Sequence, residues 1–128
     1  MEREQILNMK PGRELDALVE QYVFGNQVEW VQGDITDPYP IVPAEYGYIV
    51  ETYSTDLSAA WEVVEKMRET HVYEIADFGR NKYKNTQHYA AFHPITKPRN
   101  YERQVHAKTL PEAICKAALL AMVVSPNE

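Results

Sequence analysis

Eight residues between positions 78 and 108 have side chains of the types that bind a small anionic ligand. Guanidinium groups pair with phosphate in bidentate fashion, aromatic rings stack on a base, and amide groups read the edge of that base. All three types fall on the turns and one strand of a predicted small sheet. The candidate ligand-binding residues are Phe78, Arg80, Asn81, Tyr83, Arg99, Asn100, Arg103 and Lys108.

The charge of the chain is unevenly distributed around this segment. Residues 1–77 contain 16 acidic and 5 basic residues, whereas residues 78–108 contain 7 basic residues and the single acid Glu102. The net charge of −6 argues against general nucleic-acid binding. The basic segment can still present a positive face to a small anion. The alternative is that these cations only guard sheet edges against pairing with other chains.

Other chemistries have weaker support. The histidines fall on predicted strands without the HxH, HExxH or CxxC spacing of metal sites, so we expect no metal and no cofactor. A pair such as His88 and His106 leaves a small phosphodiesterase as an alternative. The single cysteine, Cys115, lies in an apolar helical segment and is predicted to be a buried, inert thiol. The four histidines are His71, His88, His93 and His106.

The composition is that of one folded domain over residues 1–128. Hydrophobic residues make up 45% and charged residues 25% of the chain, as in ordinary globular proteins. The longest apolar run, at residues 117–124, is too short to span a bilayer, and no apolar signal segment follows the N-terminus. We therefore expect a cytoplasmic protein with no membrane partner.

Helical spacing predicts helices before and after a sheet. A short helix is predicted at residues 2–9 and a second one from Pro11 to Gly25. A central helix is predicted up to Met67, capped by Ser54 or Thr55, with Trp61 in the middle of its buried apolar stripe. Thr109 and Glu112 have the spacing of a capping box and predict the start of a well-buried final helix.

The strands are predicted to form a short antiparallel sheet. An extended segment is expected near residues 28–31, and an antiparallel meander of three strands at residues 71–77, 87–93 and 100–107. Residues 32–53 are rich in proline and tyrosine, which predicts a long loop that acts as a lid, a partner-binding arm or an ordered coil. These elements predict an α+β architecture with layered helices.

Three segments resemble a known family. They are REQILNMKPGRELDALV, YSTDLSAAWEVVEKM and LPEAICKAALLA, at residues 3–19, 53–67 and 110–121. They are similar to the phage ABA sandwich domain family. This resemblance implies a layered α/β/α sandwich with a short antiparallel sheet and flanking helices, and a phage origin. It implies no established enzymatic activity.

A second similarity is to phage anti-defence sponge proteins, such as those that act against Thoeris immunity. It depends on chain length, phage context and the basic, aromatic segment. It implies a non-catalytic homo-oligomer in the host cell cytoplasm that sequesters a small anionic, nucleotide-derived host immune signal of the cyclic ADP-ribose type. Two alternatives stay open. One is an adaptor or inhibitor that binds a host protein through residues 32–53, and the other is the phosphodiesterase.

Overall fold

A computed structural model describes residues 1–79, 88–100 and 103–124. No helix within these ranges is long and apolar enough to cross a bilayer. The helices and strands of the described residues are α1 (Arg3–Asn8), α2 (Arg13–Tyr22), β1 (Glu29–Val31), β2 (Tyr39–Val42), β3 (Tyr48–Ile49), α3 (Leu57–Met67), β4 (His71–Asp77), β5 (His88–Pro94), β6 (Val105–Ala107) and α4 (Leu110–Val123).

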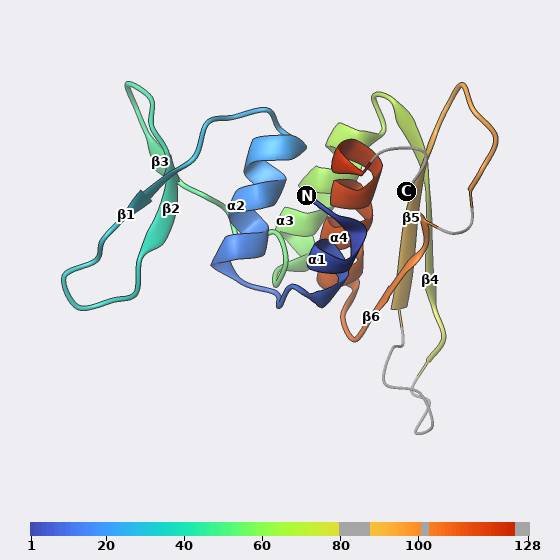
Figure 1. The fold of residues 1–128 in the computed structure, drawn as a ribbon, viewed down its shortest axis with the longest axis horizontal. Helices are drawn as coiled ribbons and strands as arrows, with labels where there is room; N and C mark the ends of the chain where they lie inside the picture. Colours follow the sequence, from blue (N-terminus) through green and yellow to red (C-terminus); the bar gives the residue numbers. More distant parts are fainter. Residues whose placement is uncertain (80–87, 101–102, 125–128) are drawn as a thin grey trace.

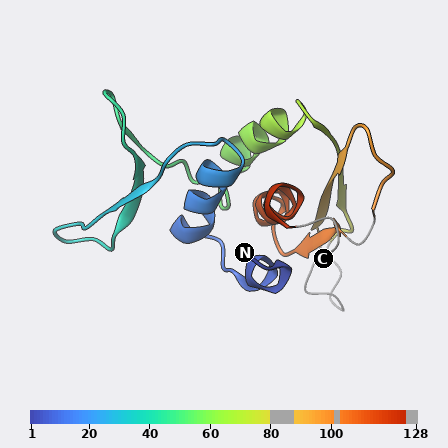
Figure 2. The same cartoon turned by 45° about the horizontal axis from the view of Figure 1, so that its top comes forward.

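The helices form a central layer between two small sheets (Figure 1). Helix α4 is the centre of this layer, because it packs on β5 and β6 with one face and on α1, α2 and α3 with the others. Figure 2 shows α4 surrounded in this way, with the β1–β2–β3 sheet beyond α2. Both sheets are antiparallel, which confirms the predicted α+β class and sandwich-like layering.

Helix α3 buries Ala60, Val64 and Met67, as its apolar spacing predicts, but its buried face is rotated away from Trp61 and towards Val63. The buried side chains are small or slender, whereas Trp61 in the predicted stripe is 40% exposed and Leu57 is exposed too. The physical reason is that α3 packs directly against the alanine-rich α4, where a bulky indole would separate the two helices. Trp61 instead makes an edge-to-face contact with Tyr73 of β4, with ring centroids 5.8 Å apart.

The cap of α3 also differs from the prediction. Asp56 is the N-cap, and its carboxylate accepts a hydrogen bond of 3.2 Å from the Ala59 amide. Ser54 is fully buried, and its hydroxyl accepts a 2.8 Å hydrogen bond from the Gly12 amide. Ser54 therefore ties the start of α2 to the start of α3 rather than capping a helix.

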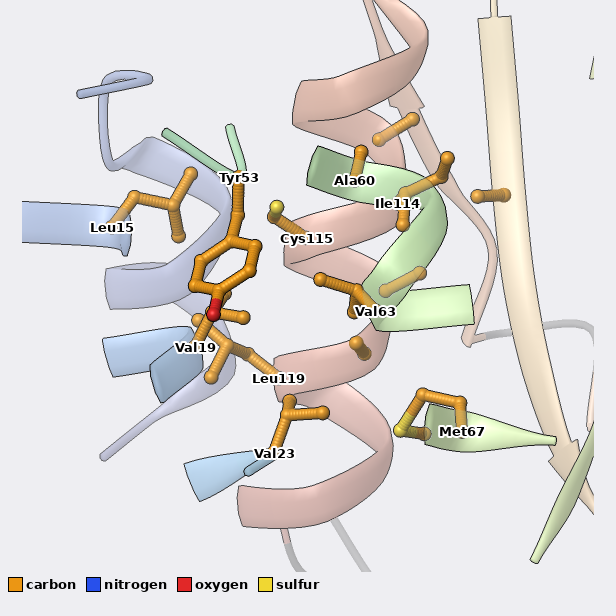
Figure 3. Packing of buried hydrophobic residues seen from close by; sticks show 14 of the residues in the cluster. Leu15, Val19, Val23, Tyr53, Ala60, Val63, Met67, Ile114, Cys115 and Leu119 are labelled. Carbon is orange, nitrogen blue, oxygen red and sulfur yellow. The ribbon is translucent and has the colours of Figure 1, made fainter. Parts of the chain in front are cut away.

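The centre of the core is formed where Tyr53 inserts between α2 and α4 (Figure 3). Its ring lies among Leu15, Val19 and Leu119, and its hydroxyl donates a 2.8 Å hydrogen bond to the buried carboxylate of Glu20. Burial, together with Glu20, raises the pKa of the Tyr53 hydroxyl. Cys115 is buried beside them, as predicted, and burial raises the pKa of its thiol.

The β4–β5–β6 sheet confirms the predicted antiparallel meander. Strand β4 has the predicted bounds, β5 extends to Pro94 before the proline-rich turn, and β6 is shorter than predicted. Helix α4 follows directly, and the Thr109 hydroxyl accepts a 3.4 Å hydrogen bond from the Glu112 amide, as predicted. The Glu112 carboxylate pairs with Lys116 instead of reaching back to the cap.

The prediction of a loop at residues 32–53 is wrong for part of that segment, because it contains β2 and β3. These strands complete a second meander with β1, in which Pro40 lies opposite Trp30. Proline cannot donate a hydrogen bond within a sheet, so its presence in β2 conceals the strand in the sequence. Its carbonyl nevertheless accepts a 3.0 Å hydrogen bond from the Val50 amide.

Candidate functional site

The β4–β5–β6 sheet has one apolar face and one polar face. Strand residues such as Ala90, Phe92 and Val105 belong to the core cluster that packs on α4. Side chains alternate along a strand, so the residues between them point to the other side. We call this side the outer face, and it carries Tyr89 and His106 near one end, Glu74 and Ala91 in the middle and His93 towards the other end.

Three aromatic side chains are clustered at the β4 C-terminal end of the outer face. Phe78 stacks on Tyr89 with ring centroids 5.6 Å apart, and His106 lies 6.1 Å from Phe78 and 5.7 Å from Tyr89. Phe78 is 51% exposed. An exposed cluster of this kind offers a stacking surface for a planar ligand group.

Polar and charged side chains are clustered at the opposite end of the outer face. The carboxylate of Glu74 pairs with Arg99, and its Oε1 lies 3.4 Å from Nε2 of His93. Nδ1 of His93 accepts a 3.3 Å hydrogen bond from the Asn100 amide. Burial lowers the pKa of His93, Glu74 opposes that shift, and Arg99 and Arg103 add to it. His93 is therefore neutral at pH 7.

A cavity of about 430 Å³ lies beside this cluster, between the turn after β5 and the end of α4. Its volume is within the range of small-molecule sites, about 300–1,000 Å³. The polar lining combines two cations, an amide and an imidazole. We call it the loop pocket, and its lining residues are His93, Pro94, Lys97, Pro98, Asn100, Arg103, Ala121, Met122 and Val124.

The structure brings together some of the predicted ligand-binding residues and separates others. Asn100 and Arg103 line the loop pocket, and Arg99 lies next to it through its ion pair with Glu74. Phe78 lies in the aromatic cluster at the other end of the sheet, and the exposed Lys108 follows β6 at that end. Arg80, Asn81 and Tyr83 lie outside the described residues.

The two ends of the outer face are far enough apart to act as separate contact regions. Tyr89 and His93 are four residues apart along β5, which corresponds to about 13 Å at about 3.3 Å per residue. A compact ligand would occupy one end, whereas a ligand that touches both must be elongated.

Three residues at or beside the loop pocket are absent from the predicted ligand-binding residues. The sequence predicts His93 to be a strand histidine without a metal, counts Lys97 only among the basic residues, and gives no role to Glu74. The alternation of His88–Pro94 could have placed His93 on the same face as Tyr89. No local pattern indicates that Arg99 reaches back to β4.

The paired histidines of the phosphodiesterase alternative do not converge. His106 lies opposite Tyr89, whereas His88 lies opposite the buried Ala107, so the two imidazoles point to opposite faces of the sheet. Within residues 1–79, 88–100 and 103–124, no cluster of three or more His, Cys, Asp or Glu side chains could hold a metal ion.

The chain is therefore a small α+β domain with two antiparallel meanders around a helical layer. The profile of the phage ABA sandwich domain matches residues 18–119, and the chain belongs to that family. A phage protein from Bacillus cereus ATCC 14579, known from a crystal structure at 2.0 Å, has the same fold, with a TM-score of 0.63. The two sequences are 24% identical, and the match covers 87% of this chain and 90% of that one. No curated protein matches the chain.

Proposed function

We propose that this phage protein binds and sequesters a small anionic, nucleotide-derived host immune signal in the loop pocket, without converting it. The observation that carries the proposal is the combination of Lys97, Asn100 and Arg103 around one cavity of suitable size. The two cations would bind phosphate, and the amide would bind the polar edge of a base or sugar. The acidic remainder of the chain would repel long polyanions and so favour a small ligand.

The neighbouring ion pair supports this assignment of roles. Glu74 already holds Arg99, so we assign to Arg99 the positioning of the loop that carries Lys97 and Asn100. Among the described residues, no carboxylate forms an ion pair with Arg103 or Lys97, and both side chains line the loop pocket. An elongated signal would extend along the outer face and stack on Phe78.

Binding without turnover is favoured by the arrangement of the histidines. His93 is neutral at pH 7, and its two ring nitrogens face the Asn100 amide and the Glu74 carboxylate. Acid–base hydrolysis of a phosphodiester would need a base at the attacking water and an acid at the leaving oxygen, both beside one phosphate. His88 and His106 cannot share these roles, because they lie on opposite faces of the sheet.

The proposal is tested by heating the purified protein with a panel of cyclic nucleotides and cyclic ADP-ribose-type signals. At least one member should raise the melting temperature and be recovered intact after denaturation. Arg103→Ala should abolish this shift, whereas the control Arg68→Ala should keep it, because Arg68 pairs with Glu65 on the surface of α3. Degraded ligand would indicate an enzyme, and no shift with any member would contradict the proposal.

A second candidate function is the binding of a host protein through the β1–β2–β3 sheet. This sheet projects from the helical layer (Figure 1) and exposes Trp30, Tyr46 and Ile49, the last of these by 64%. Residues 14–65 contain no Lys or Arg, so a partner would present a basic surface. Host proteins retained by the wild type but not by Ile49→Lys would support this function, and equal retention by both would contradict it.

A further inference from the structure

Strand β4 has a long edge that is open to pairing with another chain. It pairs with β5 on one side, and no strand of the described residues covers its other side. Edges are commonly protected by shortness, bulges, proline or charged side chains, above all lysine. The seven residues of β4 contain no proline or lysine, its two carboxylates are Glu74 and Asp77, and its register with β5 is unbroken from His71 to Asp77. The other edge strands, β1, β3 and β6, have only two or three residues each.

Apolar side chains lie along the same edge. Val72 and Tyr73 of β4 are 38% and 37% exposed, and Tyr73 contacts Trp61 of α3. Trp61 and the exposed Leu57 line a shallow cavity of about 460 Å³ together with Ser58 and Leu110. The apolar surface therefore continues from the strand edge on to α3, which leads directly into β4 (Figure 1).

We propose that this edge pairs antiparallel with the same edge of a second copy of the chain, around a two-fold axis at Glu74. In this register all seven residues of β4 have a partner. His71 lies opposite the partner's Asp77. In the tautomer in which the Thr70 hydroxyl donates to Nδ1, 2.7 Å away, the Nε2–H of His71 can donate to that carboxylate. Tyr73 lies opposite the partner's Ile75, an aromatic and β-branched pair that stabilises antiparallel sheets.

A second copy as the occupant is favoured by the pairing of His71 with the partner's Asp77 at both ends of the strand pair, and it must also satisfy charge and size at the centre. Glu74 would lie opposite the partner's Glu74, but each carboxylate is already compensated by Arg99 of its own chain. A strand pair alone is smaller than the roughly 1,200–2,000 Å² of a stable interface, so the contact must include apolar surface of α3. Leu57 and Trp61 provide that surface on the helical side of the edge. The ligand proposal does not depend on this interface.

The oligomeric state is measured by light scattering on a sizing column. The wild type should have twice the monomer mass of 14.8 kDa. Tyr73→Lys should raise the dissociation constant of the dimer at least about 100-fold, because each copy would bring an unpaired charge into the interface. The matched control is Ile49→Lys, which also places a lysine at an exposed apolar residue and should leave the dimer intact. A monomeric wild type, or a dimer broken by the control alone, would overturn the proposal.

The register is tested by disulfide cross-linking, which does not depend on how well Tyr73→Lys folds. Val72 would lie opposite the partner's Ala76, so mixing Val72→Cys with Ala76→Cys should give a cross-linked dimer under mild oxidation. Each variant alone should cross-link much less, and the buried native Cys115 should not react. Equal cross-linking of the mixture and of the separate variants would refute the register.

Discussion

The most informative stability prediction concerns Tyr53→Phe, which removes a single buried hydroxyl. That hydroxyl donates a 2.8 Å hydrogen bond to Oε1 of Glu20, whose side chain is 1% exposed. The other carboxylate oxygen, Oε2, accepts a 2.7 Å hydrogen bond from Asn26. The substitution keeps the ring that packs between α2 and α4, so it isolates the hydrogen bond from the packing (Figure 3).

The expected loss follows from the charge and burial of Glu20. A hydrogen bond to a charged group contributes about 1.5–3 kcal/mol, and the unpaired oxygen would stay buried. The bond from Asn26 would remain, so we expect the free energy of unfolding to fall by about 2 kcal/mol. In a domain of this size the melting temperature should fall by about 5–10 °C.

The assay is urea unfolding followed by far-UV circular dichroism, with Tyr48→Phe as the control. The Tyr48 hydroxyl contacts Asn26 at 3.3 Å in an exposed position, so its removal should change stability by less than about 0.5 kcal/mol. Equal effects of the two substitutions would refute the view that the Glu20 hydrogen bond stabilises the junction of α2 with the chain before α3.

Two further predictions concern the core. Burial raises the pKa of Asp16 above its ordinary value of 3.8 against the opposing effect of Ser54, so its contribution to stability is fully present below pH 3.8 and is lost as the pH rises through the higher folded pKa. As the pH rises above 3.8, the free energy of unfolding of the wild type should therefore fall relative to that of Asp16→Asn. If urea titrations give the two proteins parallel pH profiles, the pKa of Asp16 is not raised. Leu119→Ala should cost about 2–5 kcal/mol in the same titrations, because Leu119 is fully buried, and a cost below about 1 kcal/mol would mean that the site repacks.

Strong local patterns made most of the fold predictable. The threonine cap was sufficient to predict the start of α4, and the alternating residues were sufficient to predict β4. Both signals act within a few residues of the chain. The spacing correctly placed Ala60, Val64 and Met67 on the buried face of α3. It could not decide between Trp61 and Val63, because both lie on apolar arcs and the close approach of α4 excludes the larger side chain. The strand around Pro40 was missed because its pairing depends on β1 and β3 rather than on its own sequence.

The candidate site was only partly predictable for a similar reason. The basic composition of residues 78–108 directed attention to Asn100 and Arg103, which line the same cavity. The contribution of Met122 and Val124 to that cavity comes from the end of α4, more than twenty residues from the turn, and no local pattern indicates it. The ion pair between Arg99 and Glu74 is likewise a product of tertiary structure.

Ligand binding at the loop pocket is tested most directly by isothermal titration calorimetry with the panel member that gives the largest thermal shift. The wild type should bind one ligand per pocket. Arg103→Ala should raise the dissociation constant about 10-fold to 100-fold and keep the native circular dichroism spectrum. An unchanged dissociation constant in the Arg103→Ala protein would contradict the assignment of the loop pocket as the binding site.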